Sequence, residues 1–154
     1  MKSILWIGLV LLAGLSKAQN GTRHFTIQGG VGVPLLDMGS LGYEFNSQYH
    51  RRHEVFFEWM KTRERDYQTL LLGLMIKPVM FRSKATISRF RIGSALGTDL
   101  TGILLAPVMG WEFSQVCYRR LELCIGNRNQ LLLWANRAER WRVVLDAGIK
   151  IPLN

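Results

Sequence analysis

Trp141–Asn154 reads Trp-Arg-Val-Val-Leu-Asp-Ala-Gly-Ile-Lys-Ile-Pro-Leu-Asn. Its odd-numbered positions are all apolar, and its even-numbered positions include the charged residues Arg142, Asp146 and Lys150. A period of two residues over this length predicts an extended strand with one apolar face and one polar face. The strand is about twice the usual globular length, close to what a tilted strand needs to cross a bilayer. The fold therefore depends on whether the apolar face meets lipid or a core.

The same alternation returns in earlier parts of the chain. We predict seven further strands, over residues 24–33, 41–49, 53–61, 67–78, 85–96, 103–114 and 119–134. The segment 67–78 is apolar on both faces, and the last segment reaches residue 134 only if its alternation slips at 127–129. Short turn-like stretches join these segments without a convincing helical period, which indicates an antiparallel meander. The sequence therefore predicts an all-β fold, an eight-stranded antiparallel up-and-down β-barrel with both termini at one end.

Residues 1–18 have the three parts of a secretory signal peptide. Lys2 supplies the positive start, residues 4–15 are an unbroken apolar run, and residues 16–18, Ser-Lys-Ala, form a cleavage site. The apolar run is too short to span a membrane, and a cleavage motif follows it. We therefore expect residues 1–18 to be removed on export and residues 19–154 to form one barrel domain.

Glycines gather on the polar face of the predicted strands. They are Gly30, Gly32, Gly42, Gly93, Gly97, Gly110, Gly126 and Gly148. A face that only meets water has no need of glycine, whereas the crowded interior of an eight-stranded barrel needs small residues. The glycines favour a barrel whose polar face points inward and whose apolar face points to lipid.

The charged residues on that polar face are nearly balanced. The acids are Glu44, Glu54, Glu58, Glu112, Glu122 and Asp146. The bases are Arg89, Arg91, Arg120, Arg142 and Lys150. Such a set suits a desolvated network of ion pairs that fills the lumen in place of a channel. An ordinary charged surface would have a similar composition, so composition alone leaves both interpretations open.

Aromatic residues fall near the strand ends, on two levels. Phe25, Tyr49, Phe81, Trp111, Phe113 and Tyr118 come near the end that holds the termini, and Trp59, Tyr67, Trp134 and Trp141 come near the opposite end. Two aromatic girdles are typical of a lipid interface, although aromatic residues also favour strands in general. We therefore predict a transmembrane barrel. The alternative is a soluble, exported, lipocalin-like barrel that binds an apolar ligand in its interior.

The sequence offers no constellation that points to catalysis, a metal or a cofactor. His24, His50 and His53 all map to the end that holds the termini, and no cysteine or carboxylate cluster accompanies them. We therefore expect a protein that is not an enzyme and binds neither metal nor cofactor. Cys117 and Cys124 are beyond disulfide reach in an extended chain unless a turn falls between them, so we expect no structural disulfide.

The charge and the loops bear on possible partners. The net charge of +9 is spread along strands and turns, so we expect no direct contact with nucleic acid. The predicted surface loops, residues 34–40, 62–66, 98–102 and 135–140, are short. Because binding specificity usually resides in long loops, short ones indicate a structural or assembly role, or contacts made through the barrel wall.

Several short motifs carry a resemblance to a known group of proteins. They are Tyr49-His50-Arg51-Arg52 followed by Phe57-Glu58-Trp59, Leu72-Gly73 before Lys77-Pro78, and the ending Asp146-Ala147-Gly148-Ile149-Lys150. With the signal peptide and the eight alternating segments, the chain resembles the small outer-membrane β-barrels of Bacteroidota, and among these the conjugative-transposon transfer protein TraO family. The resemblance implies outer-membrane lipid as surroundings, an accessory role in a DNA-transfer apparatus with other envelope proteins as partners, and no catalytic residues.

Overall fold

The computed structural model describes residues 23–46, 51–63, 67–117, 121–135 and 140–153. The predicted signal peptide, residues 1–18, lies outside the described residues. The described residues form eight strands: β1 (Arg23–Val33), β2 (Leu36–Asn46), β3 (Arg51–Thr62), β4 (Tyr67–Arg82), β5 (Thr86–Thr98), β6 (Ile103–Val116), β7 (Glu122–Leu131) and β8 (Trp141–Leu153).

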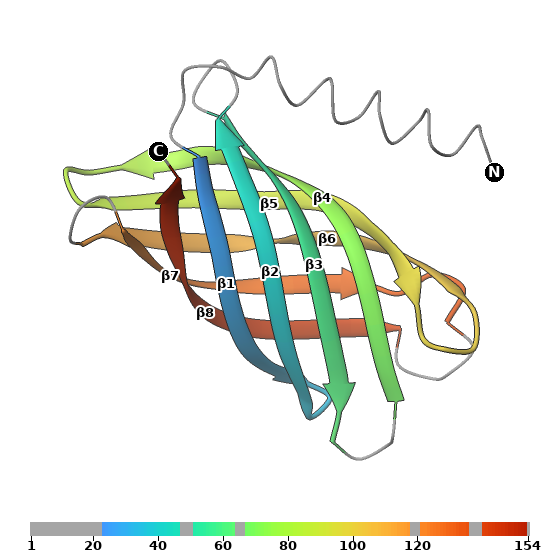
Figure 1. Cartoon of the computed structure of the whole chain (residues 1–154). Coiled ribbons are helices and arrows are strands. Elements are labelled where there is room, and N and C mark those ends of the chain that lie inside the picture. Colours follow the sequence, from blue (N-terminus) through green and yellow to red (C-terminus); the bar gives the residue numbers. More distant parts are fainter. Residues whose placement is uncertain (1–22, 47–50, 64–66, 118–120, 136–139, 154) are drawn as a thin grey trace, which may run out of the picture.

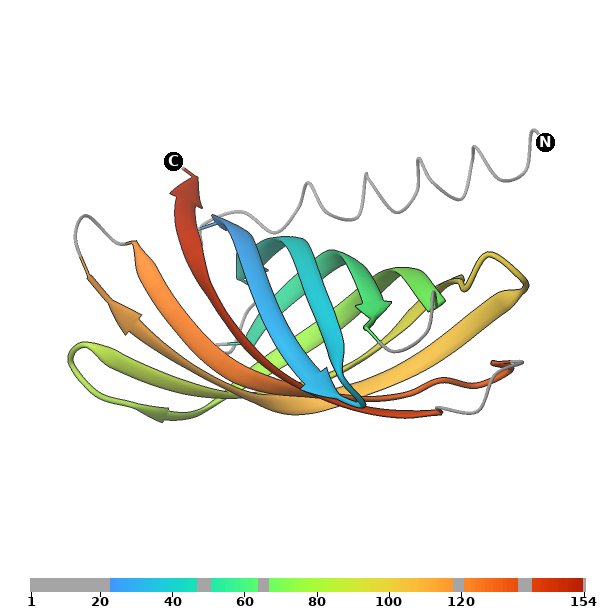
Figure 2. The ribbon, with the colours of Figure 1, turned by 90° about the horizontal axis from the view of Figure 1, so that it is seen from below.

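Each strand pairs antiparallel with the next, and β8 pairs with β1, so the sheet closes into a barrel (Figure 1). The predicted fold class is confirmed. In Figure 1, β1 to β3 run steeply across the front wall while β6 and β7 run nearly horizontally behind them, and β8 bends from the back wall up toward β1. Strands must tilt for a sheet to close on itself, so front and back strands cross. Figure 2 shows the same walls from below.

The two ends of the barrel differ in what they hold. The end with the start of β1 and the end of β8, which also carries the connections β2–β3, β4–β5 and β6–β7, is called the terminal rim below. The opposite end, with the connections β1–β2, β3–β4, β5–β6 and β7–β8, is called the distal rim. The start of β1 and the end of β8 therefore lie at one end, as predicted (Figure 1).

Several predicted strand boundaries were wrong. Residues 36–40, predicted as a loop, are the first part of β2 and pair with both β1 and β3. A turn at residues 34–35 suffices to reverse the chain, and Gly39 hides the alternation there. Arg51 and Arg52, predicted as a turn, begin β3. The strand β7 ends at Leu131 and needs no slip, because its inward and outward positions alternate regularly to its end.

The orientation of the side chains agrees with the prediction from the glycines and charges. Large apolar side chains such as Leu145, Leu72 and Ile125 face outward and are about 60–65% exposed, whereas charged side chains are buried in the lumen. This arrangement is the reverse of a lipocalin-like barrel, whose apolar face points inward. Among the described residues, no helix has the length and apolar character to cross a membrane.

Candidate functional site

The most distinctive feature of the molecule is the charged filling of its lumen. The structure places all of the predicted network residues inside except Arg120, which lies outside the described residues. The buried acids are Glu44, Glu54, Glu58, Glu112, Glu122 and Asp146. The buried bases are Arg52, Lys77, Arg89, Arg91, Arg128, Arg142 and Lys150.

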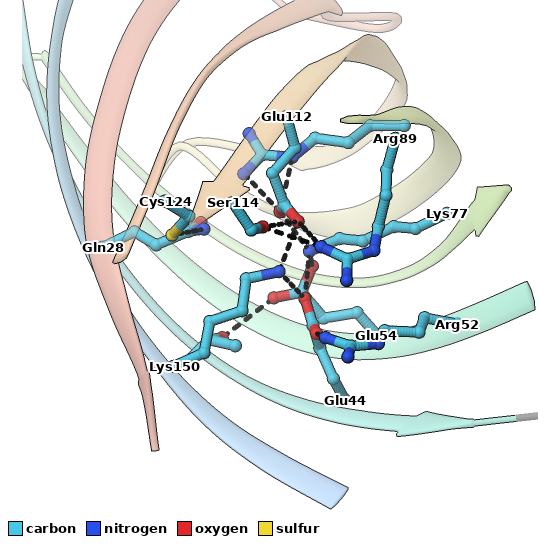
Figure 3. Close-up of polar contacts among 12 residues, drawn as sticks. Gln28, Glu44, Arg52, Glu54, Lys77, Arg89, Glu112, Ser114, Cys124 and Lys150 are labelled. Carbon is cyan, nitrogen blue, oxygen red and sulfur yellow. Dashed lines mark hydrogen bonds and ion pairs between the residues drawn. The ribbon is translucent and has the colours of Figure 1, made fainter. Parts of the chain in front are cut away.

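Five of these residues form a central cluster in which two ammonium groups bridge three carboxylates (Figure 3). Lys77 Nζ lies 2.5 Å from Glu44 Oε1, 2.7 Å from Glu54 Oε2 and 2.8 Å from Glu112 Oε2. Lys150 Nζ lies 2.6 Å from Glu44 Oε1 and also contacts Glu112. All five side chains are fully buried. They come from five different strands, so the cluster ties opposite walls of the barrel together.

Arginines extend this cluster toward the terminal rim. Arg52 donates two hydrogen bonds to the carboxylate of Glu122, at 2.8 and 3.1 Å, and one to Glu44 at 3.2 Å. Arg89 lies 3.1 Å from Glu112 and 3.5 Å from Glu122. A planar guanidinium suits this role because it can donate to two carboxylates at once in a fixed geometry.

A second set of contacts runs across the middle of the lumen. Arg91 lies 2.6 Å from Asp146 and 2.8 Å from Glu112. Arg128 lies 2.5 Å from Glu58, which also accepts a hydrogen bond from Gln130 at 2.6 Å. Because β7, which carries Arg128, is not a neighbour of β3, which carries Glu58, this pair crosses the barrel. Burying a charge without a partner costs several kcal/mol, so the close ion pairs offset the cost of placing these charges in the lumen.

The lumen is not charged throughout, and the sequence analysis did not foresee this. Toward the distal rim many of the inward side chains are apolar and form two clusters, beside buried polar groups such as Arg142, Thr69 and Asp99. The first is Phe56, Leu71, Met75, Ala95, Leu104, Ala106, Val108, Leu132 and Ala135. The second is Leu36, Met38, Met60 and Val144. The apolar inward residues of β4 explain why segment 67–78 is apolar on both faces.

Tyr67, predicted in an aromatic girdle, faces the lumen instead. Its hydroxyl donates to Asp99 Oδ2 at 3.0 Å, and the Arg142 guanidinium lies 5.5 Å from its ring centroid. The prediction was wrong because Tyr67 has the inward parity of Lys77 along β4. The other predicted girdle residues whose side chains are exposed are Trp59, Phe81, Trp111, Phe113, Trp134 and Trp141. Phe25 is half-buried, and Tyr49 and Tyr118 lie outside the described residues.

Asp99 closes the β5–β6 turn at the distal rim. Its Oδ1 accepts hydrogen bonds from the backbone and the hydroxyl of Thr101 and from the backbone of Gly102, at 2.6–2.9 Å. Burial opposes ionisation of Asp99, but these hydrogen bonds and that from Tyr67 outweigh it and lower the pKa of the carboxyl. The Asp99 side chain thus holds the turn from within.

The inward glycines make room for this filling. The backbone conformation does not require glycine at these positions, because none of the described glycines has a positive φ. At Gly73 a Cβ would overlap the Phe56 ring and lie 2.8 Å from Cβ of Ala95. At Gly126 it would lie 3.1 Å from the Arg91 guanidinium. The glycines are therefore required by the neighbours that pack over them.

We expect Gly73→Ala to lower the free energy of unfolding in detergent by about 1–3 kcal/mol, because the core around Phe56 is already full. Gly29→Ala is the matched control, since a Cβ there faces outward with its nearest neighbour, the Met38 carbonyl oxygen, at 3.8 Å. Without a clash, alanine should leave stability unchanged or raise it slightly. Urea titration followed by tryptophan fluorescence measures both, and equal effects would contradict the crowding argument.

The histidines and cysteines do not assemble a reactive site in the described part of the chain. His24 is buried with Nε2 3.7 Å from Glu122, and His53 stacks on Phe45 on the outer wall. His50 lies outside the described residues. No group of three or more His, Cys, Asp or Glu among the described residues could hold a metal ion. Cys117 is exposed and Cys124 faces the lumen, and both are free thiols although a turn lies between them.

The sequence analysis missed three lumenal residues, Arg52, Lys77 and Arg128, although each shares the even or odd numbering of the inward residues on its own strand. Arg52 lies two residues before Glu54, Lys77 two residues after Met75, and Arg128 has the same parity as Glu122. Arg52 falls in a predicted turn, Lys77 in the predicted segment whose two faces both look apolar, and Arg128 at the predicted slip. Following the inward parity of β3, β4 and β7 through these positions finds all three.

The fold is similar to solved outer-membrane barrels. The outer membrane enzyme PagL aligns with a TM-score of 0.60 at 8% identity, over 84% of this chain and 99% of that chain. Neisserial surface protein A aligns with a TM-score of 0.59 at 13% identity, over 86% and 95%. The Yersinia pestis outer membrane protein Ail aligns with a TM-score of 0.52 at 10% identity, over 86% and 100%. At these identities the likeness shows the fold alone. No family model and no curated protein matches the sequence.

Proposed function

We propose that this chain spans the outer membrane as a closed barrel that neither catalyses a reaction nor conducts, and that it serves as a structural or accessory part of the envelope. The observation that carries the proposal is the pairing of charges across the lumen, from Arg128 to Glu58 and from Lys150 to Glu44. These contacts join strands that are not neighbours. A lumen bridged in this way supports a plugged barrel, not a pore.

The outer wall supports the membrane location. Every strand carries exposed apolar side chains on its outer face. In water these side chains would form a large unfavourable apolar patch, whereas in a bilayer they contact acyl chains. A closed barrel also leaves no unpaired strand edge, which hydrocarbon requires. The predicted signal peptide and the likeness of the fold to outer-membrane barrels agree with the outer membrane as the destination.

We expect the full chain to sediment with the outer membrane and to need detergent for extraction. The folded barrel should migrate differently from the boiled chain on a gel, because a closed sheet resists unfolding by the detergent. In planar bilayers we expect no conductance steps. A folded monomer in detergent-free buffer would contradict the membrane location and favour the soluble alternative, and regular single-channel steps would contradict the plugged lumen.

The resemblance to the TraO family extends this proposal to an accessory role in conjugative DNA transfer. The connection between β5 and β6, residues 99–102, is short, which supports a role that does not depend on long binding loops. Deleting the gene from a donor strain should lower transfer frequency, and supplying it in trans should restore the frequency. Unchanged transfer would contradict this role and leave the membrane location unaffected.

A further inference from the structure

Two asparagines, Asn127 and Asn129, interrupt the apolar outer wall in the half of β7 that leads to the distal rim. The strand β7 lies in the back wall of Figure 1. Asn127 stands opposite Trp111 on β6 and Leu145 on β8. Asn129, the next outward residue, stands opposite Met109 and Val143. Both asparagines are half-buried on the outside of the barrel. Two neighbouring amides therefore lie where lipid would otherwise meet only apolar side chains.

The hydrogen-bonding groups of these amides are mostly unused. Asn127 Oδ1 accepts a hydrogen bond from the Trp111 backbone at 2.8 Å. Within the described part of the chain, the Asn127 amide nitrogen and both polar atoms of Asn129 have no hydrogen-bond partner. Hydrocarbon supplies neither donors nor acceptors, and an unsatisfied amide there costs on the order of a few kcal/mol.

The strand β7 cannot satisfy the two side-chain amides by turning them into the lumen. Arg128 lies between them in sequence and points into the lumen, where it is held by Glu58 and by Gln28, each at 2.5 Å. Because inward and outward positions alternate, any one-residue slip that buried the asparagines would expose Arg128 to lipid. The lumenal ion pair thus keeps both amides on the outer wall.

We propose that the wall around Asn127 and Asn129 is the contact surface for a second copy of this chain in the membrane; the proposal rests on the membrane location proposed above. A primary amide has a donor and an acceptor, so two identical amides can hydrogen-bond each other. A twofold axis along the membrane normal places the same residue of both copies at the same depth, so an asparagine close to the axis meets its own counterpart, and the other lies beside the crossing point of the two tilted strands. Side-chain amides are known to join membrane segments in this way.

The surroundings favour a copy of the same chain over a partner of other chemistry. The outward positions of β6, β7 and β8 carry no charged residue among the described residues, so nothing there selects a complementary charge. Met109 and Leu145, which flank the amides, are flexible or branched apolar side chains that can pack against the same residues of another copy. Self-complementary amides in an apolar surround match an interface between identical chains.

The test is energy transfer between labelled copies of the full chain in phosphatidylcholine vesicles. Cys117 is exposed and Cys124 is buried, so Cys117 is the natural site for donor and acceptor dyes. We expect transfer that saturates as the protein-to-lipid ratio rises. The variant Asn127→Leu/Asn129→Leu should need at least a tenfold higher ratio for half-maximal transfer. Gln68→Leu, which removes an outward amide on β4, should behave as the unchanged chain.

The heat-dependent gel shift, measured on the same vesicles, separates the two proposals. If the unchanged chain shows the shift yet transfers energy only as randomly placed monomers do, the dimer is overturned and the membrane location stands. Transfer by the double asparagine variant equal to that of the unchanged chain also overturns the dimer surface. If the unchanged chain does not enter the vesicles at all, both proposals fall.

Discussion

Glu112→Gln lowers the free energy of unfolding in detergent by about 3–5 kcal/mol, the range for removing one partner from a buried ion pair. Glutamine has nearly the same shape, so the change isolates the charge. Glu112 contacts Lys77, Lys150, Arg89 and Arg91. Without its carboxylate these four cations repel one another inside a low-dielectric lumen with fewer acids to offset them. Urea titration of the detergent-solubilised barrel measures the loss.

Asp37→Asn is the matched control for this prediction. Asp37 also pairs closely with an arginine, Arg63, at 2.6 Å, but both side chains are about half exposed. Water already screens this pair, so its loss should cost far less than the loss of the Glu112 carboxylate. Both variants replace a carboxylate with its amide, and they differ in burial and in the number of cations that the carboxylate contacts. If Glu112→Gln cost no more than Asp37→Asn, the lumen would have to be far wetter than its packing indicates.

Removing both members of the pair between Glu58 and Arg128 should be far less harmful than removing either one. Glu58→Leu leaves the Arg128 guanidinium buried without its carboxylate, and Arg128→Met leaves that carboxylate without its guanidinium. Each single change should cost about 3–5 kcal/mol. The double variant replaces the pair with apolar side chains beside Phe56, whose ring lies 5.2 Å from the guanidinium, so its cost should be about 2 kcal/mol or less.

The coupling between the two changes is the decisive quantity in this cycle. A large favourable coupling shows that the pair acts as a unit across the lumen, whereas additive effects would mean that each side chain is held by other partners. Gln28, Gln130 and Asp146 also contact the pair, so they set a lower limit on the cost of the double variant. Thermal unfolding monitored by the gel shift gives an independent ranking of the four proteins.

Much of this molecule is visible in local sequence because a strand in a barrel wall has only two faces. In β8 every charged residue falls on even positions, and all of them point inward. The same logic correctly placed Glu44, Glu112 and the inward glycines. Where glycine or proline interrupts the alternation, as at residues 34–40, the strand start was missed by five residues.

The sequence by itself determined that the chain forms paired strands with charges on one side and hydrocarbon on the other, because period-two alternation has one structural meaning. Which charges meet was decided only by the tertiary structure. Closure of β8 onto β1 and the register of eight strands bring Lys77 to Glu54 and Arg128 to Glu58. These contacts span long sequence separations and depend on strand tilt and register, which local alternation does not encode.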